Sequence, residues 1–358
     1  MAYTTIDDPS AYFQVETYTG AGANTSVTFS GNSDLKPDWL WLKNRSAGYA
    51  HAAFDSNRSL GSAVNAPFLE PNDTSAENSN QNWWNSTNNG INTDGFQFGS
   101  VSEHNLNNLG SEYVAWAWKV NGGTTASNSN GSITSTVQAN TDAGFSIVTY
   151  TGTGSAATVG HGLGVTPDMI IFKNRSGANV WATYHQSLGN NLKLELNGTG
   201  AQDADGAFMN GTLPTSSVFS VGASANTNTG SSNYVAYCFN NVQGYSKFGS
   251  YEGNSNANGP FVYTGFKPAF VMLKPVDVAE QWVMHDSARD PFNKAYHYLF
   301  ANGAEAEASG GTHHIDLLSN GFKVRTNNAN WNASSTVIYM AFAENTFVTS
   351  TGIPTTAR

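Results

Sequence analysis

Two lysine and aspartate combinations in this sequence have the types and spacing to do chemistry. Lys43 is followed about twelve residues later by Asp55, and Lys274 by Asp286. Such a spacing is typical of two antiparallel strands, where the cation could bind an acidic group of a ligand or pair with the carboxylate. Between these two combinations lies a similar segment in which Lys173 is followed by Gln186 in place of an aspartate. The combination is therefore not a general catalytic device. We predict two structural ion pairs, Lys43 with Asp55 and Lys274 with Asp286.

Three tryptophans lie in strongly polar surroundings. Trp83 and Trp84 occur inside the asparagine-rich run 78–89, and Trp331 is flanked by asparagines. An indole ring can stack on a sugar face while amide side chains reach the sugar hydroxyls. The alternative is that one of the adjacent pair, Trp83 or Trp84, points inward, because Met209 and Ile315 hold comparable places in the other copies of the pattern. Trp83, Trp84 and Trp331 are therefore the candidate ligand-binding residues.

The sequence carries no recognisable catalytic or metal-binding motif. Asp203 and Asp205 form only part of a calcium loop. His313 and His314 are adjacent, and neighbours in a strand point to opposite faces. We expect no enzymatic activity, no metal and no cofactor. A polysaccharide-degrading enzyme stays as an alternative, because a pair of catalytic carboxylates has no sequence signature.

One pattern of residues occurs three times along the chain. Each copy opens with tyrosine and a glycine two positions on, continues through a proline and then a lysine, and closes on an alternating aromatic strand. The opening tyrosines are Tyr18, Tyr150 and Tyr251. A repeat of about a hundred residues is too long for a small solenoid unit, so each copy should be a domain with its own core.

The periodicity within each copy is that of strands. Residues 113–118 alternate small and large side chains, whereas 167–172 and 268–273 are continuous apolar runs typical of strands buried on both faces. No convincing amphipathic helix is present. The prediction is an all-β fold of three tandem, jelly-roll-like β-sandwich domains with the first and last strands of each close together. We place the domains at 1–123, 145–244 and 245–358, the last including a C-terminal tail, with a linker at 124–144.

Composition excludes several classes of partner. Only 12% of residues are charged, and 16 Lys and Arg residues against a net charge of −10 argue against binding nucleic acid. No apolar run approaches the roughly twenty residues that span a membrane, so we expect no membrane insertion. Cys238 is the sole cysteine, which rules out an intrachain disulfide and indicates a small buried side chain in a closing strand.

Several phrases of the sequence, in order, resemble a family of virion proteins. The family belongs to tailed phages, especially those of marine and cyanobacterial hosts, and is described as structural, tail or tail-fibre protein. The matching phrases, which include the repeated Tyr-Thr-Gly, Pro-Asp, Lys-Asn-Arg and Tyr-Val-Ala-Trp strings, lie at 2–14, 37–45, 144–164, 244–268 and 338–358.

The resemblance implies a non-enzymatic virion component with no catalytic residues to carry over. It favours a tail fibre or receptor-binding appendage that contacts host surface glycans and other virion proteins. A head decoration or cement protein is the alternative, and a tailspike-type enzyme the second alternative. Residues 1–8 have neither the basic nor the apolar region of a secretory signal, so we expect assembly in the host cytoplasm. The chain could form a homotrimer, or its repeats could close into a pseudo-threefold ring, although the linker slightly favours a string.

Overall fold

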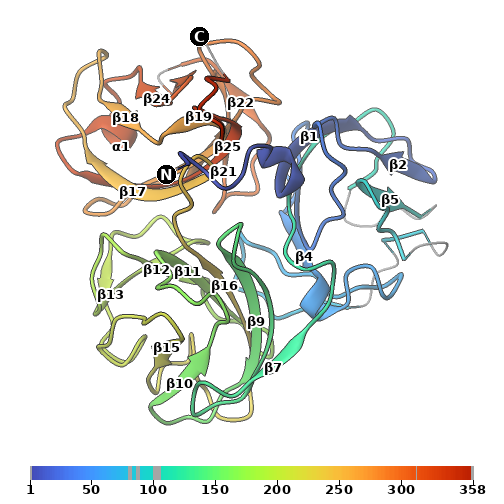
Figure 1. The fold of residues 1–358 in the computed structure, drawn as a ribbon, viewed down its shortest axis with the longest axis vertical. Helices are drawn as coiled ribbons and strands as arrows, with labels where there is room; N and C mark the ends of the chain where they lie inside the picture. The colour runs from blue at the N-terminus through green and yellow to red at the C-terminus, as the bar shows by residue number, and fades with distance from the viewer. Residues whose placement is uncertain (1, 80–82, 86–88, 100–105, 312, 356–358) are drawn as a thin grey trace.

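The computed structural model describes residues 2–79, 83–85, 89–99, 106–311 and 313–355. Within these residues the chain is almost entirely β-structure, and three sandwiches surround a common centre (Figure 1). The predicted all-β fold of several sandwiches is confirmed. In the part of the chain that the structure describes, helical structure is limited to three single turns, η1 (Pro9–Ala11), η2 (Ser56–Arg58) and α1 (Ala329–Asn332).

The first sandwich has a four-stranded main sheet and a two-stranded second layer. The main sheet runs in the order β1 (Phe13–Thr19), β6 (Glu112–Trp118), β3 (Trp39–Asn44) and β4 (Ala52–Asp55), and the second layer pairs β2 (Thr25–Val27) with β5 (Phe96–Phe98). The opening and closing strands pair antiparallel with Tyr18 opposite Tyr113, as expected from the repeat.

The second sandwich has the largest sheet. Its order is β14 (Asp203–Ala204), β13 (Leu192–Glu195), β12 (Ala182–His185), β11 (Met169–Asn174), β16 (Asn233–Phe239), β9 (Phe145–Thr151), β8 (Ser135–Asn140) and β7 (Ala126–Asn128), and it is covered by β10 (Ala157–Gly160) and β15 (Val218–Val221). Strands β7 and β8 occupy the segment 124–144, so the prediction of a linker there is wrong. The hydroxyl and amide side chains that suggested a linker belong instead to an added pair of strands.

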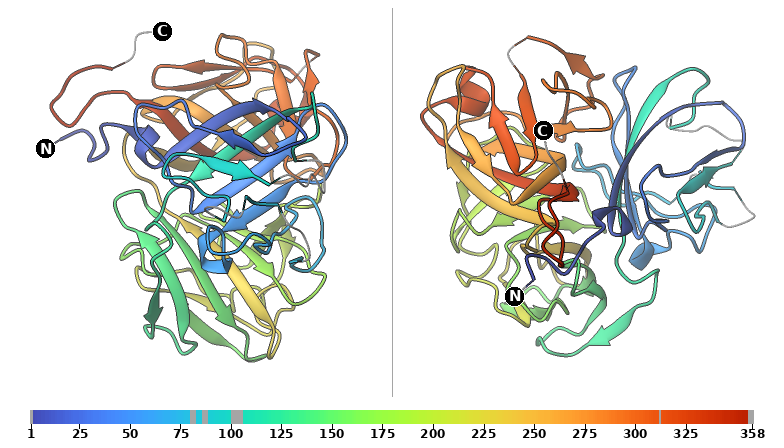
Figure 2. Two further views of the ribbon diagram at one scale, coloured as in Figure 1. Left: turned by 90° about the vertical axis from the view of Figure 1, so that its right-hand side faces the viewer. Right: turned by 45° about the horizontal axis from the view of Figure 1, so that its top comes forward.

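The third sandwich repeats the strand order of the first and adds further strands at one edge of its main sheet. Its main sheet runs β17 (Ser246–Glu252), β25 (Thr336–Thr346), β19 (Phe266–Pro275), β20 (Val283–Asp286), β21 (His297–Phe300) and β22 (Ala308–Ser309), and its second layer runs β18 (Phe261–Tyr263), β24 (Gly321–Val324) and β23 (Ile315–Leu318). Both chain ends project from one side of the molecule (Figure 2), where Ser350 donates to Asp7.

The main sheets are buried on both faces because they also pack against one another. In β3, Leu40 and Leu42 point into the first sandwich, whereas Trp39 and Trp41 point into a core shared by all three sandwiches, called the central core below. Alternate side chains of one strand thus pack into two different cores, which explains why Trp39–Leu42 of β3 is a continuous apolar run.

Aromatic rings in the central core join each sandwich to both others. Trp39 stacks on Tyr237 of the second sandwich at 4.6 Å between ring centroids, and Phe13 stacks on Phe342 of the third at 4.9 Å. Between the second and third sandwiches, the centroids of Phe239 and Phe248 are 5.6 Å apart. The three repeats therefore form a closed pseudo-threefold ring, and the expectation that a string is favoured is wrong.

Among the described residues, no helix is both long and apolar enough to pass through a bilayer.

Candidate functional site

The three tryptophans predicted to bind a ligand lie in the interiors of the sandwiches. Trp83 and Trp84 are 2% and 3% exposed, and both pack edge-on against Phe54. Trp331 is 1% exposed and meets His313 at 4.1 Å between ring centroids. None of the three rings presents a face on which a sugar could stack, so the prediction is wrong.

The predicted ion pairs of Lys43 and Lys274 do not form. Trp39 is the residue opposite Asp55 in the β3–β4 ladder, so Lys43 lies at the far end of its strand, and Phe270 opposite Asp286 puts Lys274 in the same situation. Carbonyl oxygens from the neighbouring sandwich accept hydrogen bonds from the lysines instead.

These carbonyl contacts recur at all three junctions between sandwiches. Lys43 donates to Ala304 O at 3.1 Å, and Lys274 donates to Thr199 O at 3.2 Å. Lys173, the equivalent in the second sandwich, donates to Thr74 O at 2.7 Å. Burial lowers the pKa of each of these lysines to about 8, because carbonyl dipoles replace water incompletely. The repeated lysine is a connector between sandwiches.

The two aspartates form buried ion pairs, with arginines three residues later. Asp55 Oδ2 accepts from Arg58 Nε at 2.6 Å, and both side chains are 0% exposed. Tyr237 of the second sandwich donates to the same oxygen at 2.6 Å. Asp286 and Arg289 repeat the 2.6 Å contact with both side chains again 0% exposed. Sequence reasoning missed this pairing, although the shared aspartate-to-arginine spacing was a signal for it.

Two glutamates extend these pairs across the junctions. Glu77 accepts from Arg58 at 2.9 Å and, with both oxygens, from Arg175 of the second sandwich. Glu307 of the third sandwich accepts from Arg289 and, with both oxygens, from Arg45 of the first. Burial acts to raise the pKa of Glu77, but the hydrogen bond from Arg175 and the charge of Arg58 outweigh it and lower the pKa. The charged side chains that the repeats share are engaged in closing the ring.

One ring nitrogen reaches across each junction as well. Trp181 Nε1 donates to Glu70 O and Trp282 Nε1 donates to Glu195 O, both at 2.9 Å. At the third junction, His51 holds this place. Its Nδ1 accepts from Trp41 Nε1 at 2.8 Å, so its Nε2 carries the proton and donates to Phe300 O at 3.0 Å. Burial lowers the pKa of His51 well below its ordinary value.

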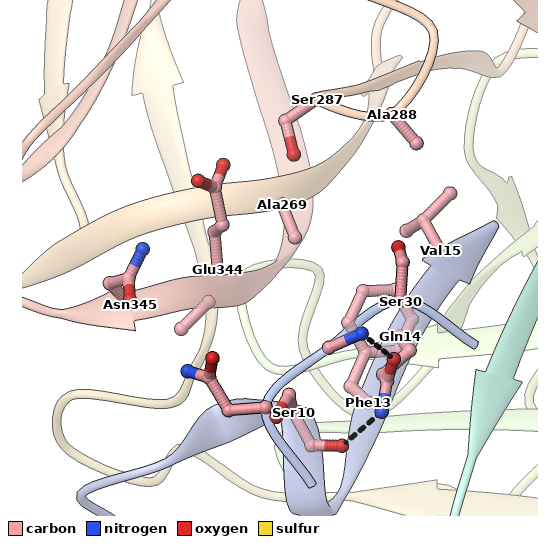
Figure 3. Close-up of a pocket in the computed structure, with 13 residues that line it drawn as sticks. Ser10, Phe13, Gln14, Val15, Ser30, Ala269, Ser287, Ala288, Glu344 and Asn345 are labelled. Carbon is pink, nitrogen blue, oxygen red and sulfur yellow. Dashed lines mark hydrogen bonds between the residues drawn. The ribbon is translucent and has the colours of Figure 1, made fainter. Parts of the chain in front are cut away.

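A cavity of about 380 Å³ lies at the junction of the third and first sandwiches. Figure 3 shows Val15 and Ser30 of the first sandwich facing Ala269 and Ser287 of the third across open space. Hydroxyl, amide and small side chains line most of it, with Glu344 at one side, where it pairs with Lys267. The lining suits an uncharged polar group better than a cation or an anion.

The described residues contain no group of three or more side chains placed to hold a metal ion. Cys238 is fully buried and burial raises the pKa of its thiol, which opposes formation of a reactive thiolate. The interior position predicted for this cysteine is confirmed.

Comparison with known proteins adds a family and no activity. No curated protein matches the chain, and no solved structure matches it. A family match spans residues 8–346, from the turn before β1 to the end of β25, so it covers the whole ring as one unit rather than any single sandwich. The chain belongs to the family described as Domain of unknown function (DUF7483).

Proposed function

We propose that the chain is a non-enzymatic structural protein of a tailed-phage particle, placed on the tail as a fibre-type or receptor-binding appendage. The observation that carries the proposal is the closed ring, in which the recurring charged side chains hold three sandwiches together. An enzyme concentrates such groups around a substrate, whereas here Asp55, Asp286 and their arginines are 0% exposed. The resemblance to phage virion proteins supports the assignment to a phage particle.

A head decoration protein is the second candidate, and the pseudo-threefold shape favours it. A single chain with three similar sandwiches about an axis can sit on a threefold position of a shell, or cap a trimeric fibre, without trimerising itself. On the tail, contact with host glycans would fall to the polar outer loops, since the indole rings of Trp83, Trp84 and Trp331 are buried.

The number of copies in a purified particle tests both candidates. Quantitative mass spectrometry of particles, scaled to the major capsid protein, should find a few to a few dozen copies for a tail appendage and hundreds for a head protein. Absence of the chain from purified particles would contradict the proposal.

A glycan array probed with the purified ring tests the host contact separately. Loss of viscosity when the ring is incubated with host polysaccharide would identify the enzymatic alternative instead.

A further inference from the structure

The pseudo-threefold ring allows the same place to be compared at three junctions. That place is the edge of each opening strand (β1, β9 or β17) that faces away from its closing strand and toward the neighbouring sandwich. Val15, Ile147 and Phe248 are equivalent there, because each stands three residues before the tyrosine that opens its repeat and pairs with the closing strand in the same register. What covers this strand edge differs among the three junctions.

At the junction of the first and second sandwiches, a strand fills it. Strand β8 pairs antiparallel with β9 and sets Gln138 opposite Ile147. The Gln138 side chain is 0% exposed, and its amide donates to Ser56 Oγ at 2.7 Å and to Asn57 Oδ1 at 2.9 Å. Its oxygen accepts from the backbone of the first sandwich, from Asn121 N at 3.0 Å and from Gly123 N. All hydrogen-bonding positions of this amide are used.

At the junction of the second and third sandwiches, side chains seal it. Phe248 N donates to Asn241 Oδ1 at 2.7 Å, and Phe248 O accepts from Gln186 Nε2 at 2.6 Å. These two amide groups take the place of a neighbouring strand, so the edge of β17 needs no further partner at this point.

At the junction of the third and first sandwiches, the place is open. Ser287 and Ala288 stand where Ser56 and Asn57 stand in the first sandwich, and the 380 Å³ cavity separates them from Val15. By the equivalence of Val15 with Ile147 and of Ser287 with Ser56, the cavity lies at the position that Gln138 and its strand occupy at the first junction. Figure 3 shows it between Val15 and Ser287.

The edge of β1 also has free backbone groups at this point. Gly20 N donates to Ser111 O and Lys119 N donates to Tyr12 O, so the even-numbered residues of β1 bond to β6. Val15 therefore directs its N–H and C=O away from β6, and among the described residues neither group has a partner. An unpaired N–H and C=O beside a cavity is the arrangement that accepts an added strand.

We propose that the edge of β1 and the adjoining cavity accept an extended, uncharged strand of another protein. The strand runs antiparallel to β1, as β8 runs to β9, and an amide side chain opposite Val15 enters the cavity toward Ser287. An amide fits because it matches Gln138 at the first junction, whereas a buried charge would find no free counter-ion, since the one carboxylate of the lining, Glu344, is already paired with Lys267. This inference deepens the proposed structural role and rests on it only for the partner being a protein of the particle.

Binding of a peptide that copies residues 132–141, the β8 segment, tests the acceptor edge. We expect saturable binding of the fluorescent peptide to the full chain by anisotropy, and binding about tenfold weaker when glutamate replaces the residue corresponding to Gln138. Thr17→Pro removes an N–H from the same edge, one that donates to Glu16 Oε1 at 3.2 Å in the free chain and would have to turn to the added strand, and it should weaken binding at least about tenfold. Ser250→Pro makes the equivalent change on β17 and should leave binding unchanged.

Ala288→Trp fills the cavity from the third sandwich and should abolish peptide binding. This variant leaves β1 unchanged, so it tests the site independently of whether the proline variant folds. Peptide binding that is absent up to about 1 mM, or that both prolines weaken equally, would overturn the inference. Self-association of the ring that Thr17→Pro removes would also overturn it, by assigning the edge to a second copy. Peptide binding and particle content are independent measurements, so the acceptor edge and the virion role can fail separately.

Discussion

Replacing Asp55 by asparagine should destabilise the ring strongly, because it leaves a buried cation short of its partner. The asparagine keeps the shape of the side chain, but Arg58 stays 0% exposed with Glu77 as its one remaining carboxylate, 2.9 Å away. Breaking one side of a buried ion pair costs about 3–5 kcal/mol. Since Glu77 remains, we expect the lower end, a loss of about 3 kcal/mol in the free energy of unfolding.

The second sandwich indicates how the loss can be rescued. Where the first sandwich has Asp55 and Arg58, the second has Gln186 and Gly189, so the fold tolerates removal of both charges together. Arg58→Met alone leaves the aspartate unpaired and should also be costly. The double variant Asp55→Asn with Arg58→Met should lose less than either single variant, which gives a coupling energy of about 3 kcal/mol.

Urea unfolding followed by tryptophan fluorescence measures these free energies, since Trp39 and Trp118 lie in the central core and report its opening. The cycle needs the wild type, both single variants and the double variant under one set of conditions. If the two single losses add to the double loss within about 0.5 kcal/mol, the buried pair does not act as a unit and the reasoning is refuted.

Three further predictions follow from buried titratable groups. Burial lowers the pKa of His185 to about 4, so the unfolded chain binds more protons below about pH 6.5; thermal unfolding scans should show stability falling from pH 6.5 toward 4, by up to about 3 kcal/mol from this residue, and His185→Gln should flatten the fall. Burial lowers the pKa of Lys173 to about 8, so its contribution to stability should rise with pH between about 8 and 10.5, and a steeper rise in Lys173→Met than in the wild type would count against this. Cys238 should react with a thiol reagent only when the second sandwich opens, so labelling should follow the unfolding rate in urea; rapid labelling of the native chain would place the thiol elsewhere.

Sequence reasoning reached the strand content and the threefold repetition because both depend on local patterns. Alternation predicts strands, and the recurring tyrosines, such as Tyr18 and Tyr113, mark strands that pair in the structure. It named the closed ring only as an alternative to a string, because a run such as Trp39–Asn44 indicates that both faces of a strand are buried without indicating what covers the second face. In this protein the second cover is another copy of the same sheet.

The candidate site was predicted less well because it depends on register and on distant segments. The Lys43 prediction assumed that a lysine and an aspartate on neighbouring strands meet, but the ladder sets Trp39 opposite Asp55. The tryptophan prediction assumed that polar neighbours imply exposure, yet Trp331 is 1% exposed beneath its asparagine loop. The cavity beside Val15 has no sequence signal of its own, because it becomes visible only when three junctions are compared in space.

Covalent fusion of the three repeats has a consequence for assembly. A trimer of identical subunits presents three identical seams, so a partner that fits one seam fits all three equally well. In this chain the seams have diverged: one is filled by β8, one is sealed by Gln186 and Asn241, and one is vacant. The ring thereby keeps a threefold outline but has one attachment point. A ring seated on a threefold-symmetric site of a particle would then bind a single partner, on one side of the axis.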